Sequence, residues 1–183
     1  ADVALISRGG YGLTRILPGI AYKKVAKAIE GGTQFVGLSD FTAFQLALLA
    51  KTGAISWAGP ALGEDFGVEG EPDDIMEACF DDLVQDQGEG AGWRLPLERV
   101  PNTPEIVAKK DRETMGNGQL VTKNAVLWGG NLSVLVALLG TPYWPEVKGG
   151  VLFIEDVNEH PFRIERMLTQ LLQAGALGRQ KAI

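Results

Sequence analysis

The chain has 183 residues, of which 45% are hydrophobic and 22% are charged, and this composition is typical of a folded globular protein. Its formal net charge of -6 argues against a surface that binds nucleic acid or an anionic membrane, since either would need clustered Lys and Arg. The one cysteine excludes an internal disulfide and fits a reducing compartment. No apolar run reaches the roughly 18 residues that a membrane-spanning helix needs.

Apolar runs alternate with helical patterns in the first 60 residues or so. Strands are expected at residues 3–6, 34–38 and 54–57, and helices at residues 13–17, 22–29 and 41–49. Glycine pairs or prolines separate most of these segments, as turn chemistry requires. Strands that alternate with helices predict a parallel sheet, so the fold class is α/β.

The second half of the chain follows an irregular middle. Residues 88–118 contain Gly, Pro, Asn and charged residues without sustained periodicity, which indicates a hinge region. We therefore predict an N-terminal domain over residues 1–88, a linker over 89–118 and a second domain over 119–183. Further strands are expected at residues 124–128 and 151–154, and helices at 74–84, 132–139 and 162–174. The last helix is amphipathic, with Ile164, Met167, Leu168, Leu171 and Leu172 predicted to face inward.

Ser39 follows a predicted strand and precedes a predicted helix, with Gly37 two residues before it. A nucleophilic serine needs such a sharp turn, because its hydroxyl must project toward the substrate while the next amide, that of Asp40, points at the developing oxyanion. Phe41 stands where the strict pattern has a second glycine. The local pattern also fits a helix cap by Ser39 or Asp40, and it does not separate the two interpretations.

Gly9 and Gly10 follow the first predicted strand, where glycines let backbone amides approach an anionic centre. A second oxyanion donor beside Ser39 is one interpretation. A phosphate-binding turn is another, although the spacing matches neither the dinucleotide-binding pattern nor the lysine-bearing phosphate loop. A tight turn without any ligand is the third, and the glycines alone do not exclude it.

Glu155 ends an apolar strand, at the edge of the sheet where α/β proteins gather their sites. It would suit the carboxylate that orients a catalytic histidine, with Asp156 and Glu159 as nearby competitors. His160 is the one histidine of the chain and lies five residues after Glu155. A base and its orienting acid from one short loop are awkward to bring together at Ser39. A structural role at the start of the last helix is favoured for His160.

Four segments together closely resemble the murein LD-carboxypeptidases, a family that includes the microcin C immunity peptidases. They occur in the family's order and run over nearly the whole chain. They are Arg8-Gly9-Gly10-Tyr11-Gly12, Gly37-Leu38-Ser39-Asp40-Phe41-Thr42-Ala43, Trp128-Gly129-Gly130-Asn131-Leu132, and the stretch at residues 152–168 that includes Asn158-Glu159-His160-Pro161-Phe162-Arg163.

The resemblance implies a cytoplasmic serine peptidase of cell-wall recycling. Such enzymes release the terminal D-alanine of murein tetrapeptides by cleaving its amide to meso-diaminopimelate or L-lysine, and they use a Ser–Glu–His triad without a metal or other cofactor. The family fold pairs a flavodoxin-like N-terminal domain with a smaller, swivelling C-terminal α/β domain, and the active site lies between them. Relatives also suggest a homodimer.

Carried over to matching positions, the resemblance makes Ser39 the nucleophile and Glu155 the acid of the triad. The amides of Gly10 and Asp40 resemble the oxyanion donors. Substrate contacts are expected from Arg8, Gly9, Trp128 and Asn131. The phenylalanine after Ser39-Asp40 is itself the family's form, so it supports the assignment.

Family members continue beyond both ends of the matching segment, and the catalytic histidine lies in their C-terminal portion. We therefore expect a chain truncated at both ends, with residues 178–183 leading into a strand, and negligible turnover by these 183 residues alone. Two alternatives stay open. One is an immunity-type peptidase acting on a peptide–nucleotide amide, for which the short loop after Trp57 offers no clear aromatic platform. The other is a fragment that keeps the pocket without the reaction.

Overall fold

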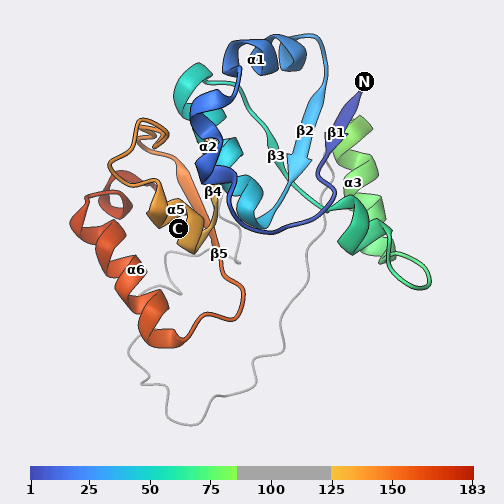
Figure 1. Ribbon diagram of the computed structural model, residues 1–183. Helices are drawn as coiled ribbons and strands as arrows, with labels where there is room; N and C mark the ends of the chain where they lie inside the picture. The colour runs from blue at the N-terminus through green and yellow to red at the C-terminus, as the bar shows by residue number, and fades with distance from the viewer. Residues whose placement is uncertain (86–124) are drawn as a thin grey trace.

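The computed structural model describes residues 1–85 and 125–183, which contain two parallel sheets (Figure 1). The first sheet has the order β1-β2-β3, from β1 (Val3–Leu5), β2 (Gln34–Gly37) and β3 (Trp57–Ala58). The second sheet pairs β4 (Leu127–Asn131) with β5 (Val151–Glu155). All three strand pairings are parallel, which confirms the predicted α/β class.

In the described residues, five α-helices connect or cover the strands: α1 (Tyr22–Glu30), α2 (Thr42–Thr52), α3 (Asp74–Gln85), α5 (Leu132–Ala137) and α6 (Pro161–Gln173). The helices predicted at residues 22–29, 41–49, 74–84, 132–139 and 162–174 are thus confirmed to within a few residues at each end. The predicted linker, residues 89–118, lies outside the described residues. The exact domain boundaries stay a prediction. None of the helices in the described ranges is long and apolar enough to cross a membrane.

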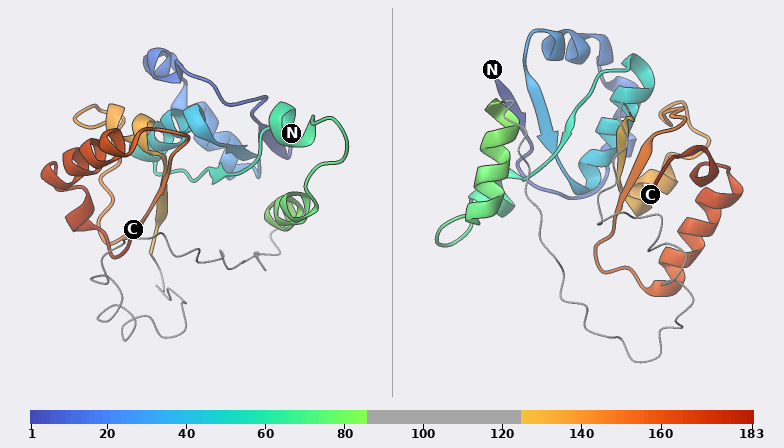
Figure 2. Two further views of the ribbon diagram at one scale, coloured as in Figure 1. Left: turned by 90° about the horizontal axis from the view of Figure 1, so that it is seen from below. Right: turned by 180° about the vertical axis from the view of Figure 1, so that it is seen from behind.

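Helix α2 lies between the two sheets and carries the centre of the core (Figures 1 and 2). It packs against β4 and α5 on one side, and its Gln45 side chain donates hydrogen bonds to the Gly37 and Trp57 carbonyls of the first sheet. Because it is covered on most sides, its sequence is apolar nearly all round rather than striped. Gly53 ends it in the left-handed region, at φ 73. A single helix therefore links the halves that carry Ser39 and Glu155.

Helix α6 packs on α5 through one face, as its periodicity predicts. Leu171 is fully buried, and Ile164, Met167 and Leu168 are partly buried against the core. The inward position predicted for Leu172 was wrong, since its side chain is 61% exposed. One residue turns an α-helix by about 100°, so Leu172 leaves the stripe that Leu171 occupies.

Two local predictions in the first half were wrong. The segment predicted as a strand at residues 54–57 pairs only at Trp57–Ala58, which lie opposite Val36 and Gly37 of β2. The helix predicted at residues 13–17 is instead two short 3-10 turns, at Leu13–Arg15 and Leu17–Gly19. By contrast, the strand-like character predicted for residues 178–183 is confirmed at Ala182, which bridges in parallel to Val151 beside β5.

Candidate active site

Ser39 occupies the turn that connects β2 to α2. Its φ of 58 puts a non-glycine residue in the left-handed region, which costs roughly 1–2 kcal/mol. Leu38 before it is extended, and the 3-10 turn Ser39–Phe41 after it leads directly into α2. Strain of this kind persists only where the surroundings fix the backbone, and it is concentrated at functional turns. The backbone at Ser39 therefore has the geometry of a strand–nucleophile–helix turn.

The helix-cap interpretation of Ser39 and Asp40 finds no support in the hydrogen bonds of the described residues. Neither side chain caps the 3-10 turn or α2. The buried Asp40 carboxylate instead accepts the Leu13 N–H at 2.9 Å, which ties the Gly9–Gly10 loop to the Ser39 turn. In the described part of the chain, the N–H groups of Gly10 and Asp40 donate to no other protein group. Within the described residues, both predicted oxyanion donors are thus without a protein acceptor.

Gly9 lies directly against Ser39. A Cβ at Gly9 would be 3.2 Å from Ser39 Cβ and 3.3 Å from Ser39 Oγ, so only glycine fits there without pushing the serine aside. The loop after β1 and the turn after β2 therefore meet at the carboxyl edge of the first sheet, where α/β proteins bind their ligands.

Glu155 is connected to the Ser39 turn through Asn131. The parallel register of β4 and β5 pairs these two residues, and Asn131 Nδ2 donates to Glu155 Oε2 at 3.4 Å. The Asn131 N–H donates to Thr42 Oγ1 at 3.0 Å, three residues after Ser39. The Asn131 Oδ1 atom caps α5 by accepting the Val134 N–H at 3.2 Å. The carboxyl end of β5 is thereby fixed to the start of α2.

The Trp128-Gly129-Gly130-Asn131 segment permits this approach because of its glycines. A Cβ at Gly130 would collide with the Thr42 side chain, and its φ of 135 lies outside the range that other residues favour. Trp128 is 5% exposed, stands edge-on to the Trp144 ring and donates from Nε1 to Gln180 Oε1 at 3.1 Å. Trp128 therefore has a packing role, and the substrate contact predicted for it stays a prediction.

Arg8 is exposed beside the glycine turn, where it forms an ion pair of 3.8 Å with Glu64. The Gly9 N–H donates to Glu64 Oε2 at 2.9 Å. Sequence reasoning missed Glu64, which lies in the helical turn Leu62–Phe66 outside every motif. No local sequence pattern identifies Glu64, because its place depends on contacts between distant residues. The N–H groups of Leu62 and Gly63 donate to the Ile6 and Ser7 carbonyls, and these bonds hold Glu64 beside the end of β1.

His160 is exposed at the residue that precedes α6, and its ring stacks on Phe162 with centroids 5.6 Å apart. This is the helix-start position favoured for it from the sequence. Within residues 1–85 and 125–183, no three or more His, Cys, Asp or Glu side chains are grouped to hold a metal ion.

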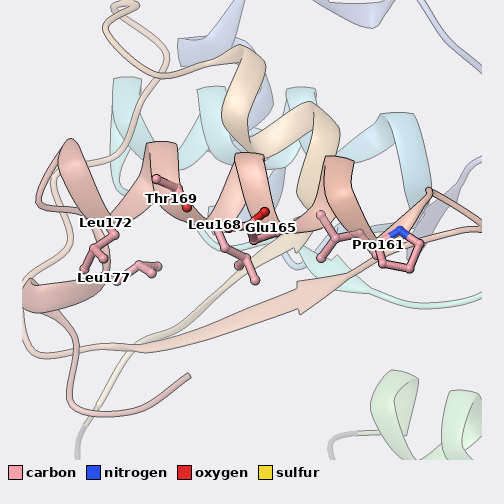
Figure 3. Close-up of a pocket in the computed structure, with 7 residues that line it drawn as sticks. Pro161, Glu165, Leu168, Thr169, Leu172 and Leu177 are labelled. Atoms are coloured by element: carbon pink, nitrogen blue, oxygen red, sulfur yellow. The ribbon is translucent and has the colours of Figure 1, made fainter.

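Two cavities lie away from this arrangement. A groove of about 390 Å³ runs along α6 and is lined by seven residues that include Pro161, Leu168 and Leu177 (Figure 3). A second, apolar cavity of about 490 Å³ lies between residues 54–58 and residues 125–129. Neither Ser39 nor Glu155 lines either of them. The candidate site is therefore defined by hydrogen bonds and backbone geometry rather than by either of these two cavities.

Models of the two LD-carboxypeptidase domains match both described parts of the chain. The model of the N-terminal domain matches residues 1–59, and that of the C-terminal domain matches residues 124–183. The chain belongs to the LD-carboxypeptidase family. The order of the two matches agrees with the order of the two sheets, so the family's N-terminal domain corresponds to β1-β2-β3 and its C-terminal domain to β4-β5.

Individual relatives of this LD-carboxypeptidase chain agree with that placement. A probable murein peptide carboxypeptidase of Bacillus subtilis is 34% identical over 94% of the chain and 48% of its own length. The microcin C7 self-immunity protein of Escherichia coli is 29% identical over 89% of the chain and 49% of its own. The crystal structure of a muramoyltetrapeptide carboxypeptidase from Oxalobacter formigenes matches with a TM-score of 0.72 and 36% identity, covering 99% of the chain and 54% of that protein. The chain thus spans about half the length of the relatives it matches.

Proposed function

We propose that the protein is a serine LD-carboxypeptidase that releases terminal D-alanine from murein tetrapeptide, with Ser39 as nucleophile. The observation that carries the proposal is the left-handed Ser39 backbone between β2 and α2, with Gly9 in contact with its side chain. One relative is named a probable murein peptide carboxypeptidase and another a muramoyltetrapeptide carboxypeptidase, and these names support a murein peptide as the substrate.

In the proposed reaction, Ser39 Oγ attacks the carbonyl carbon that precedes D-alanine, and its proton passes to a histidine base. In the family that the chain resembles, this histidine lies in the C-terminal portion, which the chain does not span. The amides of Gly10 and Asp40 stabilise the oxyanion of the tetrahedral intermediate. The C–N bond then breaks, D-alanine leaves with the proton from the base, and water hydrolyses the acyl-Ser39 ester.

Glu155 is proposed to orient the histidine and to stabilise its protonated form, as the acid of a triad does. Its hydrogen bond from Asn131, and the bond from Asn131 to Thr42, support this role because they fix the carboxylate relative to the Ser39 turn. Without the histidine the serine hydroxyl is a poor nucleophile, so we propose that activity belongs to the full-length protein. A cytoplasmic place in cell-wall recycling and a homodimeric assembly are part of the same proposal.

The test measures D-alanine release from murein tetrapeptide by the full-length protein. Ser39→Ala and Glu155→Gln are each expected to lower kcat by about a thousandfold or more. Matched controls are Ser56→Ala, beside β3, and Glu159→Gln, in a partly exposed ion pair with Arg163, and both should retain activity. Retained activity in Ser39→Ala would refute the nucleophile assignment. Cleavage of a peptidyl-nucleotide amide in preference to the tetrapeptide would indicate an immunity-type peptidase instead.

A further inference from the structure

A carboxylate already lies beside the proposed nucleophile, and it belongs to the protein itself. Glu64 accepts the Gly9 N–H at 2.9 Å through Oε2, while its Oε1 faces the Arg8 guanidinium at 3.8 Å. One neutral donor and one cation thus converge on a single carboxylate. The other arginine of this loop, Arg15, is engaged differently, since its guanidinium stands 5.3 Å from the centre of the Tyr11 ring.

The separation of this carboxylate from Ser39 is compatible with the length of one substrate residue. A Cβ at Gly9 would lie 3.3 Å from Ser39 Oγ and 3.5 Å from Glu64 Oε2, so the two oxygens are less than about 7 Å apart. In a peptide substrate, the attacked carbonyl carbon and the carbon of the terminal carboxylate are at most about 3.6 Å apart. The attacking Oγ and the carboxylate oxygens lie beyond these two carbons, so one substrate residue can span the separation. A terminal carboxylate bound by Arg8 and the Gly9 N–H would therefore leave the scissile carbonyl next to Ser39.

The interaction with Glu64 is of a kind that a substrate can replace. The side chains of Arg8 and Glu64 are 72% and 49% exposed, and an ion pair at such exposure contributes little to stability. If a substrate carboxylate takes the place of the Glu64 carboxylate, the Gly9 N–H and the guanidinium keep an anionic acceptor throughout. Exchange of one carboxylate for another leaves no donor unpaired, which keeps its cost low.

We propose that Arg8 and the Gly9 N–H form the subsite for the terminal carboxylate of the substrate, and that Glu64 occupies this subsite in the free protein. The proposal rests on the proposed carboxypeptidase function and adds the group that recognises the chain end. Glu64 is then an internal competitor, because the apparent dissociation constant equals the intrinsic one divided by the fraction of time for which the subsite is free.

The first test compares a tetrapeptide that ends in a free carboxylate with the same peptide ending in a carboxamide. Dissociation constants are measured calorimetrically on the full-length Ser39→Ala protein, so that binding is read without turnover. Arg8→Met should weaken binding of the free acid by roughly tenfold or more and leave binding of the amide nearly unchanged. Equal loss for both peptides would overturn the subsite assignment.

The second test removes the competing charge. Glu64→Gln in the same background should tighten binding of the free acid by roughly threefold to tenfold, and in the active protein it should lower KM by a similar factor. A fall in kcat with unchanged KM would overturn the competitor role, because it would mean that Glu64 only positions the glycine turn. Glu146→Gln and Arg179→Met disrupt a comparable exposed ion pair of 2.9 Å near the other end of β5, and they should change neither constant.

The two proposals fail separately. If Ser39→Ala keeps full activity, the nucleophile assignment is wrong, whatever the binding constants show. If Ser39→Ala is inactive but Arg8→Met does not distinguish acid from amide, the serine carboxypeptidase proposal stands and the subsite assignment is wrong.

Discussion

The Asn131 N–H donates a hydrogen bond of 3.0 Å to Thr42 Oγ1, across 89 residues of sequence. The bond is buried, with Thr42 1% exposed and Asn131 9% exposed. It joins the first turn of the helix that follows Ser39 to the end of the strand that pairs with Glu155. The relative position of the proposed nucleophile and the proposed acid therefore depends on this contact.

Thr42→Val tests that dependence, because valine keeps the shape of threonine and removes only the acceptor. The Asn131 N–H would remain buried without a partner, so the free energy of unfolding should fall by about 1–3 kcal/mol. We also expect a loss in kcat of tenfold or so, since the end of β4 is no longer fixed to α2. Urea unfolding and D-alanine release measure the two effects.

Thr42→Ser is the matched control, since it keeps Oγ and loses only a methyl group. It should retain most of the activity that Thr42→Val loses. If the two variants are equally active, the hydrogen bond to Asn131 does not position the site, and the contact contributes to stability alone.

The turn at Ser39 was predictable because its signals are local. An apolar strand, a glycine two residues earlier and an apolar helix afterwards are all read within about a dozen residues. The parallel pairing of the strands likewise follows from their alternation with helices. The family resemblance then supplied the choice between nucleophile and helix cap, which the local pattern left open.

The link from Thr42 through Asn131 to Glu155 and the place of Glu64 were not predictable in this way. The first depends on the register of β4 against β5, which no segment specifies alone. The second depends on residues 62–63 returning to the end of β1. Both are contacts between distant parts of the chain, and a single sequence without aligned relatives contains no signal for such pairs.

Replacement of Ser39 by glycine should stabilise the fold while it removes the proposed nucleophile. At φ 58, serine pays a backbone cost of roughly 1–2 kcal/mol that glycine avoids. Part of that gain is lost because glycine increases the entropy of the unfolded chain, so the net gain should be about 0.5–1 kcal/mol. Ser39→Ala keeps the strain and should show no such gain. Equal unfolding free energies for the glycine and alanine variants would contradict strain at this residue.

Gly130→Ala should be among the most damaging small substitutions in the site. Its Cβ would collide with Thr42, so the backbone cost of about 1–3 kcal/mol at φ 135 is joined by an overpacking cost of about 1–3 kcal/mol. Gly70→Ala is the control, because φ is also positive there, at 108, while a Cβ would meet nothing within 4 Å. If both variants lose the same stability, close packing against Thr42 is not the reason for the glycine.

Tyr22 should make stability depend on pH in the alkaline range. Burial, and to a smaller extent the neighbouring Tyr143, raises the pKa of the Tyr22 phenol above its ordinary value of 10.0. The stabilising effect of the neutral phenol is complete below pH 10.0. Above it the unfolded chain releases its proton first, so the folded protein binds more protons and the free energy of unfolding falls until the pH passes the folded-state pKa.

Tyr22→Phe should therefore flatten the decline in stability above pH 10.0. It should also cost about 1 kcal/mol at neutral pH, because the hydroxyl no longer donates to the Leu17 carbonyl at 2.9 Å. Tyr11→Phe, at a side chain that is 84% exposed, provides the control and should leave the slope intact. Chemical denaturation at several pH values gives both quantities. An identical alkaline slope in Tyr22→Phe and the unmodified protein would show that ionisation of Tyr22 is not linked to unfolding.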